Sequence, residues 1–185
     1  SKEERGRAKS YLNRPEAEVC VCLLKALRAS QQRFENERNH MRERTRQWMD
    51  SCARHGASCV WGGLCGRIAL LTPYNAQKAE LERHLRHEGL LGDHTPPTES
   101  TDAPLCIASV DSFQGHERDV VIYTCVRGDP AGPGGSIGFV KDRQRMNVAL
   151  TRAKHALYVV GSEASLRSST DWAALLADAR ERGCW

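Results

Sequence analysis

Short, uninterrupted apolar runs alternate with amphipathic stretches along most of the chain. Four runs have the length and composition of buried strands: IALLTPY (68–74), LCIASV (105–110), VVIYTCV (120–126) and ALYVVG (156–161). Helical spacing of apolar residues predicts helices over NAQKAELERHLRHEG (75–89), RQRMNVALTRA (143–153) and DWAALLADARERG (171–183). Strands that are apolar at every position are typical of a parallel sheet with both faces covered. The pattern therefore predicts a doubly wound α/β fold in three layers, with helices on both faces of a parallel sheet.

The N-terminal third is less regular. Residues 1–10 are predicted to be a linker, and a helix is predicted to start around Asn13, which can cap it, with Pro15 in its first turn. Glu16 and Glu18 favour the positive end of that helix dipole. Residues 30–66, polar at first and then aperiodic, are interpreted as an insertion that either prolongs this helix or forms an exposed excursion. Residues 1–185 are otherwise interpreted as a single domain.

Composition adds a few limits. The formal net charge of +4 is compatible with a polyanionic partner. No apolar run approaches the roughly 20 residues that a membrane helix needs, and SKEERGRAKS lacks the apolar segment of a signal peptide, so we expect an intracellular protein with no membrane partner. Eight cysteines are scattered, and Cys106 and Cys125 lie inside strand runs, which favours free thiols in a reducing compartment. The spacing of Cys52, His55, Cys59 and Cys65 fits no paired CxxC zinc site, so we expect no metal.

Three segments resemble the C-terminal motor domain of superfamily 1B helicases of the up-frameshift and senataxin type. They are LLTPYNAQKAEL, IASVDSFQGHERDVVIYTCVRG and GSIGFVKDRQRMNVALTRAKHALYVVG, which are similar to the family's strand–TPY–helix block, motif V and motif VI. SYLNRPEAEVC also resembles the segment near the start of that domain, and GSIGF, TRAK and the tail DWAALLADARERG are most similar to senataxin-like members. The resemblance implies a RecA-like fold of the P-loop NTPase type.

The resemblance also implies roles in ATP hydrolysis. Arg152 corresponds to the arginine finger that stabilises the transferring phosphoryl group, an effect worth about 10³–10⁵ in rate. Glu117 corresponds to the residue that accepts a hydrogen bond from the nucleotide ribose. Gln114 is a candidate for sensing the phosphate, and Gly115 permits a tight backbone turn near a ligand. Arg145, seven residues before Arg152, contacts either a second phosphate or the domain interface, or else forms an ion pair with Asp142 or Glu117.

Candidate nucleic-acid contacts lie where buried strands end. Hydroxyls and backbone amides at Thr72, Ser109 and Asp111 can hold phosphates of single-stranded RNA or DNA, and Pro73, next to Thr72, is a further candidate contact. The alternative is structural: Thr72 and Ser109 satisfy backbone groups in turns, and Asp111 caps the turn that follows.

The sequence contains no G-x-x-x-x-G-K-[ST] phosphate loop, so it holds only part of an ATP site. ATP with Mg²⁺ is expected to bind mainly to a first RecA-like domain that precedes this one, and the isolated chain is expected to hydrolyse no ATP. Expected partners are that domain and single-stranded RNA or DNA, including RNA–DNA hybrids. A nuclear location follows from the senataxin resemblance, with the cytoplasm as the alternative. The competing hypothesis is a catalytically inactive helicase-derived scaffold or nucleic-acid-binding module.

Overall fold

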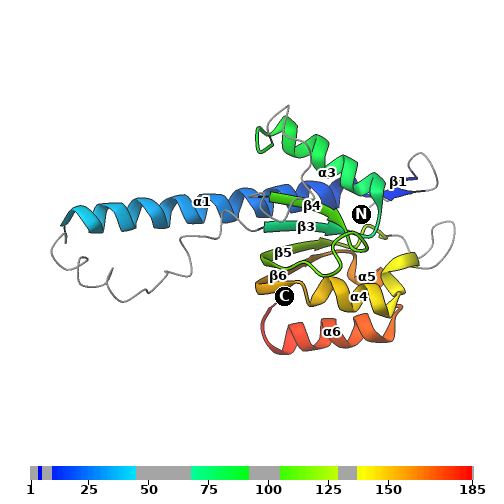
Figure 1. Ribbon diagram of the computed structural model, residues 1–185. Helices are drawn as coiled ribbons and strands as arrows, with labels where there is room; N and C mark the ends of the chain where they lie inside the picture. Colours follow the sequence, from blue (N-terminus) through cyan, green and yellow to red (C-terminus); the bar gives the residue numbers. More distant parts are fainter. Residues whose placement is uncertain (1–3, 6–9, 45–67, 92–104, 129–136, 185) are drawn as a thin grey trace.

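A parallel sheet forms the centre of the molecule (Figure 1). The computed structural model describes residues 4–5, 10–44, 68–91, 105–128 and 137–184. The sheet has the order β4-β3-β5-β6, and every neighbouring pair is parallel. Its strands are β3 (Ile68–Thr72), β4 (Leu105–Ser109), β5 (Arg118–Thr124) and β6 (Ala153–Val160). The predicted parallel sheet is therefore confirmed.

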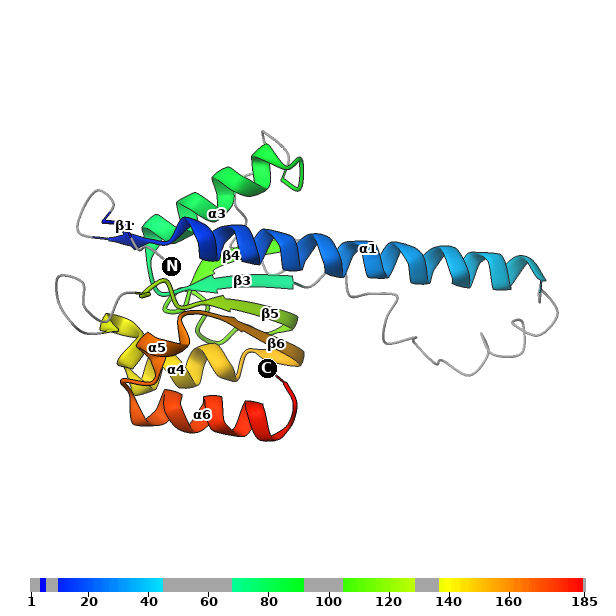
Figure 2. The same ribbon diagram turned by 180° about the vertical axis from the view of Figure 1, so that it is seen from behind.

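Helices cover both faces of this sheet. One face carries α1 (Arg14–Arg44) and α3 (Asn75–His87). The other carries α4 (Arg143–Leu150), α5 (Glu163–Leu166) and α6 (Thr170–Glu181), with a short 3-10 helix, η4 (Gly138–Lys141), leading into α4. Figure 2 shows the same arrangement from behind, with α1 above the sheet and α4 and α6 below it. The three-layer prediction is confirmed.

The alternation of side chains along each strand builds two separate cores. On β5, Val120 and Ile122 pack against α1 and α3, whereas Val121 and Tyr123 face the opposite core. That second core includes Trp172 of α6, whose ring stacks on Tyr123 with 6.2 Å between centroids. Because both faces are buried, the strands contain apolar residues at consecutive positions rather than alternating ones.

The start of α1 follows the predicted capping pattern. Asn13 Oδ1 accepts a hydrogen bond from the backbone N–H of Glu16 at 3.2 Å, as an N-cap does. The predicted linker over residues 1–10 contains a short strand, β1 (Glu4–Arg5), which pairs antiparallel with β2 (Tyr11–Leu12). The helix continues to Arg44 and extends beyond the sheet (Figure 2), so residues 30–44 of the predicted insertion prolong it. Residues 45–67, including the four cysteine and histidine residues considered for zinc, lie outside the described part.

Two predicted boundaries around motif VI are wrong. The helix predicted over 143–153 ends at Leu150, and the strand predicted from 156 already begins at Ala153. Thr151 Oγ1 donates to Asn147 O at 2.7 Å in the last turn, and Arg118 N donates to Arg152 O at 3.0 Å. Pairing with β5 thus draws the chain into the sheet earlier than the helical pattern indicates. Arg152 stands between α4 and β6.

Candidate functional site

The predicted site residues divide between the two ends of the parallel strands. Thr72 and Ser109 end β3 and β4 at the carboxyl edge of the sheet, whereas Glu117 precedes β5 and Arg152 precedes β6 at the amino edge. β5 has seven residues. At about 3.3 Å per residue the two edges are roughly 20 Å apart. The sheet therefore separates the candidate nucleic-acid contacts from the candidate ATP contacts.

Helix α4 runs between these two edges, beside the connection from β4 to β5. Arg145 donates from Nε and Nη2 to the two carboxylate oxygens of Asp111, at 2.8 and 3.0 Å. Arg152 donates from Nη1 to the backbone oxygen of His116 at 3.4 Å. The two arginines therefore contact the same connecting segment, one at its carboxyl-edge end and the other at its amino-edge end.

Arg145 is held by ion pairs. Its main partner is Asp111, and Asp142 lies second, with 3.8 Å between Nη1 and Oδ2. Glu117 pairs instead with Lys154, 3.9 Å from its Nζ. The hydrogen bond to Asp111 raises the pKa of the Arg145 guanidinium above its already high usual value. Of the two alternatives for Arg145, the structure contains the ion pair, mainly with a carboxylate that the sequence did not indicate.

Arg152 has a different environment. Its guanidinium donates to Val148 O at 3.2 Å, to Thr151 Oγ1 at 2.8 Å and to His116 O at 3.4 Å. All three acceptors are neutral, and among the described residues no carboxylate lies within ion-pair distance of it. The side chain is only half-buried. Its position is fixed while its positive charge is not neutralised by a described acidic group.

The segment beside Arg152 is open to solvent. Gln114, Gly115, His116 and Glu117 are all exposed, and the Glu117 side chain retains 52% of its accessible surface. Gly115 has a φ of 85°, a conformation that glycine adopts without strain. This matches the predicted tight turn. The segment therefore presents an amide, a carboxylate and backbone groups beside an uncompensated guanidinium.

At the carboxyl edge the predicted contacts differ in accessibility. Thr72 is fully buried in the central strand β3, and its hydroxyl accepts from Tyr74 N at 3.4 Å. The hydroxyl therefore contacts a backbone group of the following turn in this conformation, as the structural alternative for Thr72 describes. Ser109 is half-buried and exchanges hydrogen bonds with Ser112, with 2.9 Å between the hydroxyls. Pro73 is also half-buried, and Asp111 is exposed but pairs with Arg145 rather than capping a turn.

A buried polar network that the sequence pattern did not predict lies at this carboxyl edge. Glu16 Oε2 accepts from Thr124 Oγ1 and from Val126 N, both at 2.7 Å. Asn13 donates to Glu16 Oε1 at 3.1 Å and to Val126 O at 2.9 Å. Gln77 joins from α3, accepting from Asn13 N at 2.7 Å. We call Asn13, Glu16, Gln77, Thr124 and Val126 the carboxyl-edge network. Its only sign in the sequence is a set of polar side chains at the starts of two helices that otherwise face the core.

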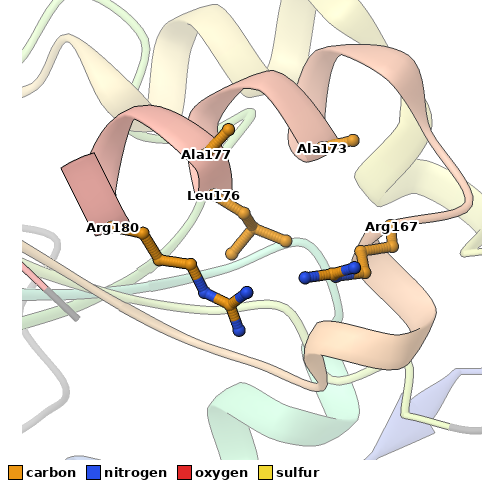
Figure 3. Close-up of a pocket in the computed structure, with 5 residues that line it drawn as sticks. All are labelled: Arg167, Ala173, Leu176, Ala177 and Arg180. Carbon is orange, nitrogen blue, oxygen red and sulfur yellow. The ribbon is translucent and has the colours of Figure 1, made fainter.

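A pocket lies between α6 and Arg167, the residue that follows α5 (Figure 3). Its floor is aliphatic, and Arg167 and Arg180 flank it. Both arginines donate to the same oxygen of Glu163 at 2.7 Å, so their charge is partly neutralised. None of the predicted site residues lines this pocket.

The described residues contain no group of three or more histidine, cysteine, aspartate or glutamate side chains arranged to hold a metal ion. No described helix is both long enough and apolar enough to span a membrane.

Several known proteins are similar to this chain in sequence. A family model described as an AAA domain matches residues 1–164. ATP-dependent helicase NAM7 of Saccharomyces cerevisiae is 39% identical over 118 residues, which cover 64% of this chain and 11% of NAM7. The chain belongs to the superfamily 1 helicases of the up-frameshift and senataxin type. Within them it is a C-terminal motor domain, as the motifs predict.

Other helicases of this family match the same share of the chain. Helicase SEN1 of Saccharomyces cerevisiae is 35% identical over 120 residues, 64% of this chain and 5% of SEN1. Probable helicase senataxin of Homo sapiens is 39% identical over 116 residues, 63% of this chain and 4% of senataxin. The identities to NAM7 and human senataxin are equal, so they do not favour the senataxin branch. The chain spans about a tenth or less of the length of these helicases.

Proposed function

We propose that this domain is the second motor domain of an ATP-dependent RNA or DNA helicase, and that Arg152 is its arginine finger. In this proposal Glu117 accepts a hydrogen bond from the ribose of ATP, and Gln114 and Gly115 lie beside the phosphates. A first RecA-like domain of the same protein binds most of the ATP and its Mg²⁺. The isolated domain then hydrolyses no ATP. The segments GSIGF, TRAK and DWAALLADARERG, which are most similar to senataxin-like members, favour a nuclear helicase, with the cytoplasm as the alternative.

The observation that carries the proposal is the environment of Arg152. Three neutral acceptors orient its guanidinium, and no described carboxylate neutralises it. A guanidinium that is fixed but uncompensated can stabilise the negative charge that develops on a transferring phosphoryl group. By contrast, the guanidinium of Arg145 already forms an ion pair with Asp111. We therefore assign the phosphate contact to Arg152 and a positioning role to Arg145.

The exposed groups around Arg152 fit a nucleotide. Glu117 presents a carboxylate, the group that accepts hydrogen bonds from a ribose diol in dinucleotide-binding folds. Its partner Lys154 is 3.9 Å away and both side chains are about half exposed, so the pair is weak and open to exchange. Gly115 lies in the turn before Glu117 and has no side chain that could obstruct a ligand there.

The opposite edge is proposed to bind a single strand of RNA or DNA, including the strand of an RNA–DNA hybrid. Pro73 and Ser109 retain accessible surface there, and Asp111 and Arg145 lie next to them as a bidentate pair. Because α4 contacts the β4–β5 connection at both ends, closure around ATP at one edge can shift the strand contacts at the other.

The test is single-strand-stimulated ATP hydrolysis by the full-length protein, wild type against Arg152→Ala. We expect turnover to fall 10²-fold or more while strand affinity changes less than about threefold, because only transition-state stabilisation is removed. Arg167→Ala is the matched control. It removes another partly exposed arginine, on the pocket beside α6, and should leave turnover unchanged.

The two other outcomes separate the alternatives. If the Arg152→Ala variant hydrolyses ATP at the wild-type rate, another group supplies the arginine finger. Absence of turnover in a folded wild-type protein that still binds single strands would favour the inactive scaffold.

A further inference from the structure

Phe139 is the most exposed large apolar side chain among those whose burial the structure describes, with 52% of its surface accessible. It lies in η4, immediately before the cap of α4. Its neighbours Ile137 and Val140 are buried, and Trp172 Nε1 donates to the backbone oxygen of Val140 at 2.7 Å. The turn is therefore anchored to the core by Ile137 and Val140, while Phe139 is its one large apolar side chain that is exposed.

The Phe139 ring is supported by a row of aromatic and cationic groups. Its centroid lies 5.7 Å from that of Tyr74, which in turn lies 5.5 Å from that of Tyr11. The Arg145 guanidinium lies over the Phe139 ring, 4.5 Å from its centroid, and Arg127 lies 4.1 Å from the centroid of Tyr11. Asp111 fixes Arg145 through two hydrogen bonds, so the ring is held in a defined orientation.

These contacts place Phe139 at the carboxyl edge of the sheet. Tyr74 follows β3 by two residues, and Asp111, which holds Arg145, follows β4 by two residues. The exposed ring therefore lies with Pro73 and Ser109, the residues proposed to contact a single strand. Arg152 and Glu117 are at the other edge, roughly 20 Å away along β5.

We propose that Phe139 stacks on a nucleobase of the bound single strand, with Arg145 supporting the ring from one side. This inference rests on the proposed function and adds to it a contact with the bases, where the other proposed contacts are with phosphates. A fixed, accessible aromatic ring suits any of the bases, because every base has a flat π face. Recognition of the strand by this contact is therefore independent of the strand's base sequence.

The experiment measures equilibrium binding of the full-length protein to two labelled single strands of equal length and charge. One is a homopolymer of pyrimidine nucleotides, and the other has abasic sites in place of its central nucleotides. We expect Phe139→Ala to weaken binding to the first strand about tenfold, within the range for loss of one stacked base. Binding to the abasic strand should change less than twofold, because phosphate contacts are retained.

Two further variants separate stacking from general effects. Phe139→Trp keeps an aromatic face and should restore affinity for the base-containing strand, whereas Phe139→Leu keeps apolar bulk and should not. Tyr158→Ala is the control, because Tyr158 is also a partly exposed aromatic, at 36%, but lies on the edge strand β6. It should leave both affinities unchanged.

The outcomes distinguish the inference from the proposed function. Equal loss of affinity on both strands, or rescue by Phe139→Leu, would overturn base stacking while leaving the motor function intact. A change in the KM for ATP without a change in strand affinity would place the adenine on Phe139 and also overturn the inference. A folded wild-type protein that binds neither strand would overturn the nucleic-acid part of the proposed function, and the inference with it.

Discussion

Gly138 shows how one residue fixes the turn that carries Phe139. Its φ is 57°, and a Cβ atom at this position would lie 2.6 Å from Tyr74 Oη. Tyr74 is buried, so its ring has little room to move away. Gly138→Ala combines backbone strain with a steric clash, and we expect it to lower the free energy of unfolding by about 2–3 kcal/mol. Denaturant unfolding of the purified protein measures this.

Gly89 provides the matched control for that substitution. Its φ is 65°, yet nothing lies within 4 Å of where its Cβ would be. Gly89→Ala therefore carries the backbone strain alone, about 1 kcal/mol. If the two variants lose the same stability, the contact with Tyr74 contributes nothing and the clash argument is wrong.

At the scale of single residues, the sequence predicted the chemical type of each site side chain but not the residue with which it pairs. The sequence predicts that Arg145 is either a ligand contact or half of an ion pair. It does not indicate Asp111, 34 residues earlier, as the partner. Thr72 shows the same limit, because a hydroxyl at a strand end is compatible with binding a phosphate or with satisfying a turn. Its full burial is set by the strands and helices around it.

At the scale of elements, the carboxyl-edge network ties two helices to the sheet. Its centre is Glu16, a buried carboxylate in the first turn of α1 that accepts from Thr124 and from Val126 N on and just after β5. Val126 has a φ of 70°, which is unfavourable for a β-branched residue and is maintained by these hydrogen bonds. The network thereby fixes the backbone at the end of β5.

Glu16→Gln tests this assignment. The amide keeps the shape of the side chain but replaces one acceptor oxygen with a donor, which leaves a buried N–H group without an acceptor. We expect the free energy of unfolding to fall by about 1–3 kcal/mol. Glu18→Gln is the control two residues along the same helix, where the side chain is exposed, and it should change stability by less than about 0.5 kcal/mol. If both variants lose the same free energy of unfolding, helix-dipole interactions and not the network account for the contribution of Glu16 to stability.

Periodicity located the helices and strands well but not their ends near motif VI. The pattern RQRMNVALTRA continues past Leu150, yet the chain leaves the helix there because residues from Ala153 onward pair with β5. That pairing is a long-range interaction that the local pattern does not contain. The short helix α5 was not predicted either, since four residues are too few to show a period.

At the scale of the whole molecule, the two cores bury some thiols and leave others in solvent. Cys22 and Cys184 are exposed, whereas Cys20, Cys106 and Cys125 are buried. Burial raises the pKa of Cys20 to about 12 and raises that of Cys125 well above its usual value. A raised pKa keeps a thiol protonated and unreactive as the pH rises.

Alkylation with iodoacetamide followed by peptide mapping checks this arrangement. We expect the native protein at pH 8 to be labelled at Cys22 and Cys184, and at Cys20, Cys106 and Cys125 only after denaturation. Cys20 should stay unlabelled at pH 9 as well, because its thiol remains protonated there. Cys20 and Cys22 form an internal control, since they lie two residues apart on α1. Labelling of both at equal rates in the native state would contradict the packing of α1 on the sheet.

The sequence alone determined the class of fold, the family and the types of side chain at the sites. Continuous apolar strands require a sheet covered on both faces, and the segments around Gln114 and Arg152 are specific enough to identify a helicase motor domain. The tertiary structure decided which charges are compensated, which hydroxyls are buried and how the candidate site residues divide between the two edges of the sheet. It paired Arg145 with Asp111, whereas every acceptor of Arg152 in the described part of the chain is neutral. These properties arise from contacts between residues far apart along the chain, and a local pattern of hydrophobic and polar positions carries no information about such contacts.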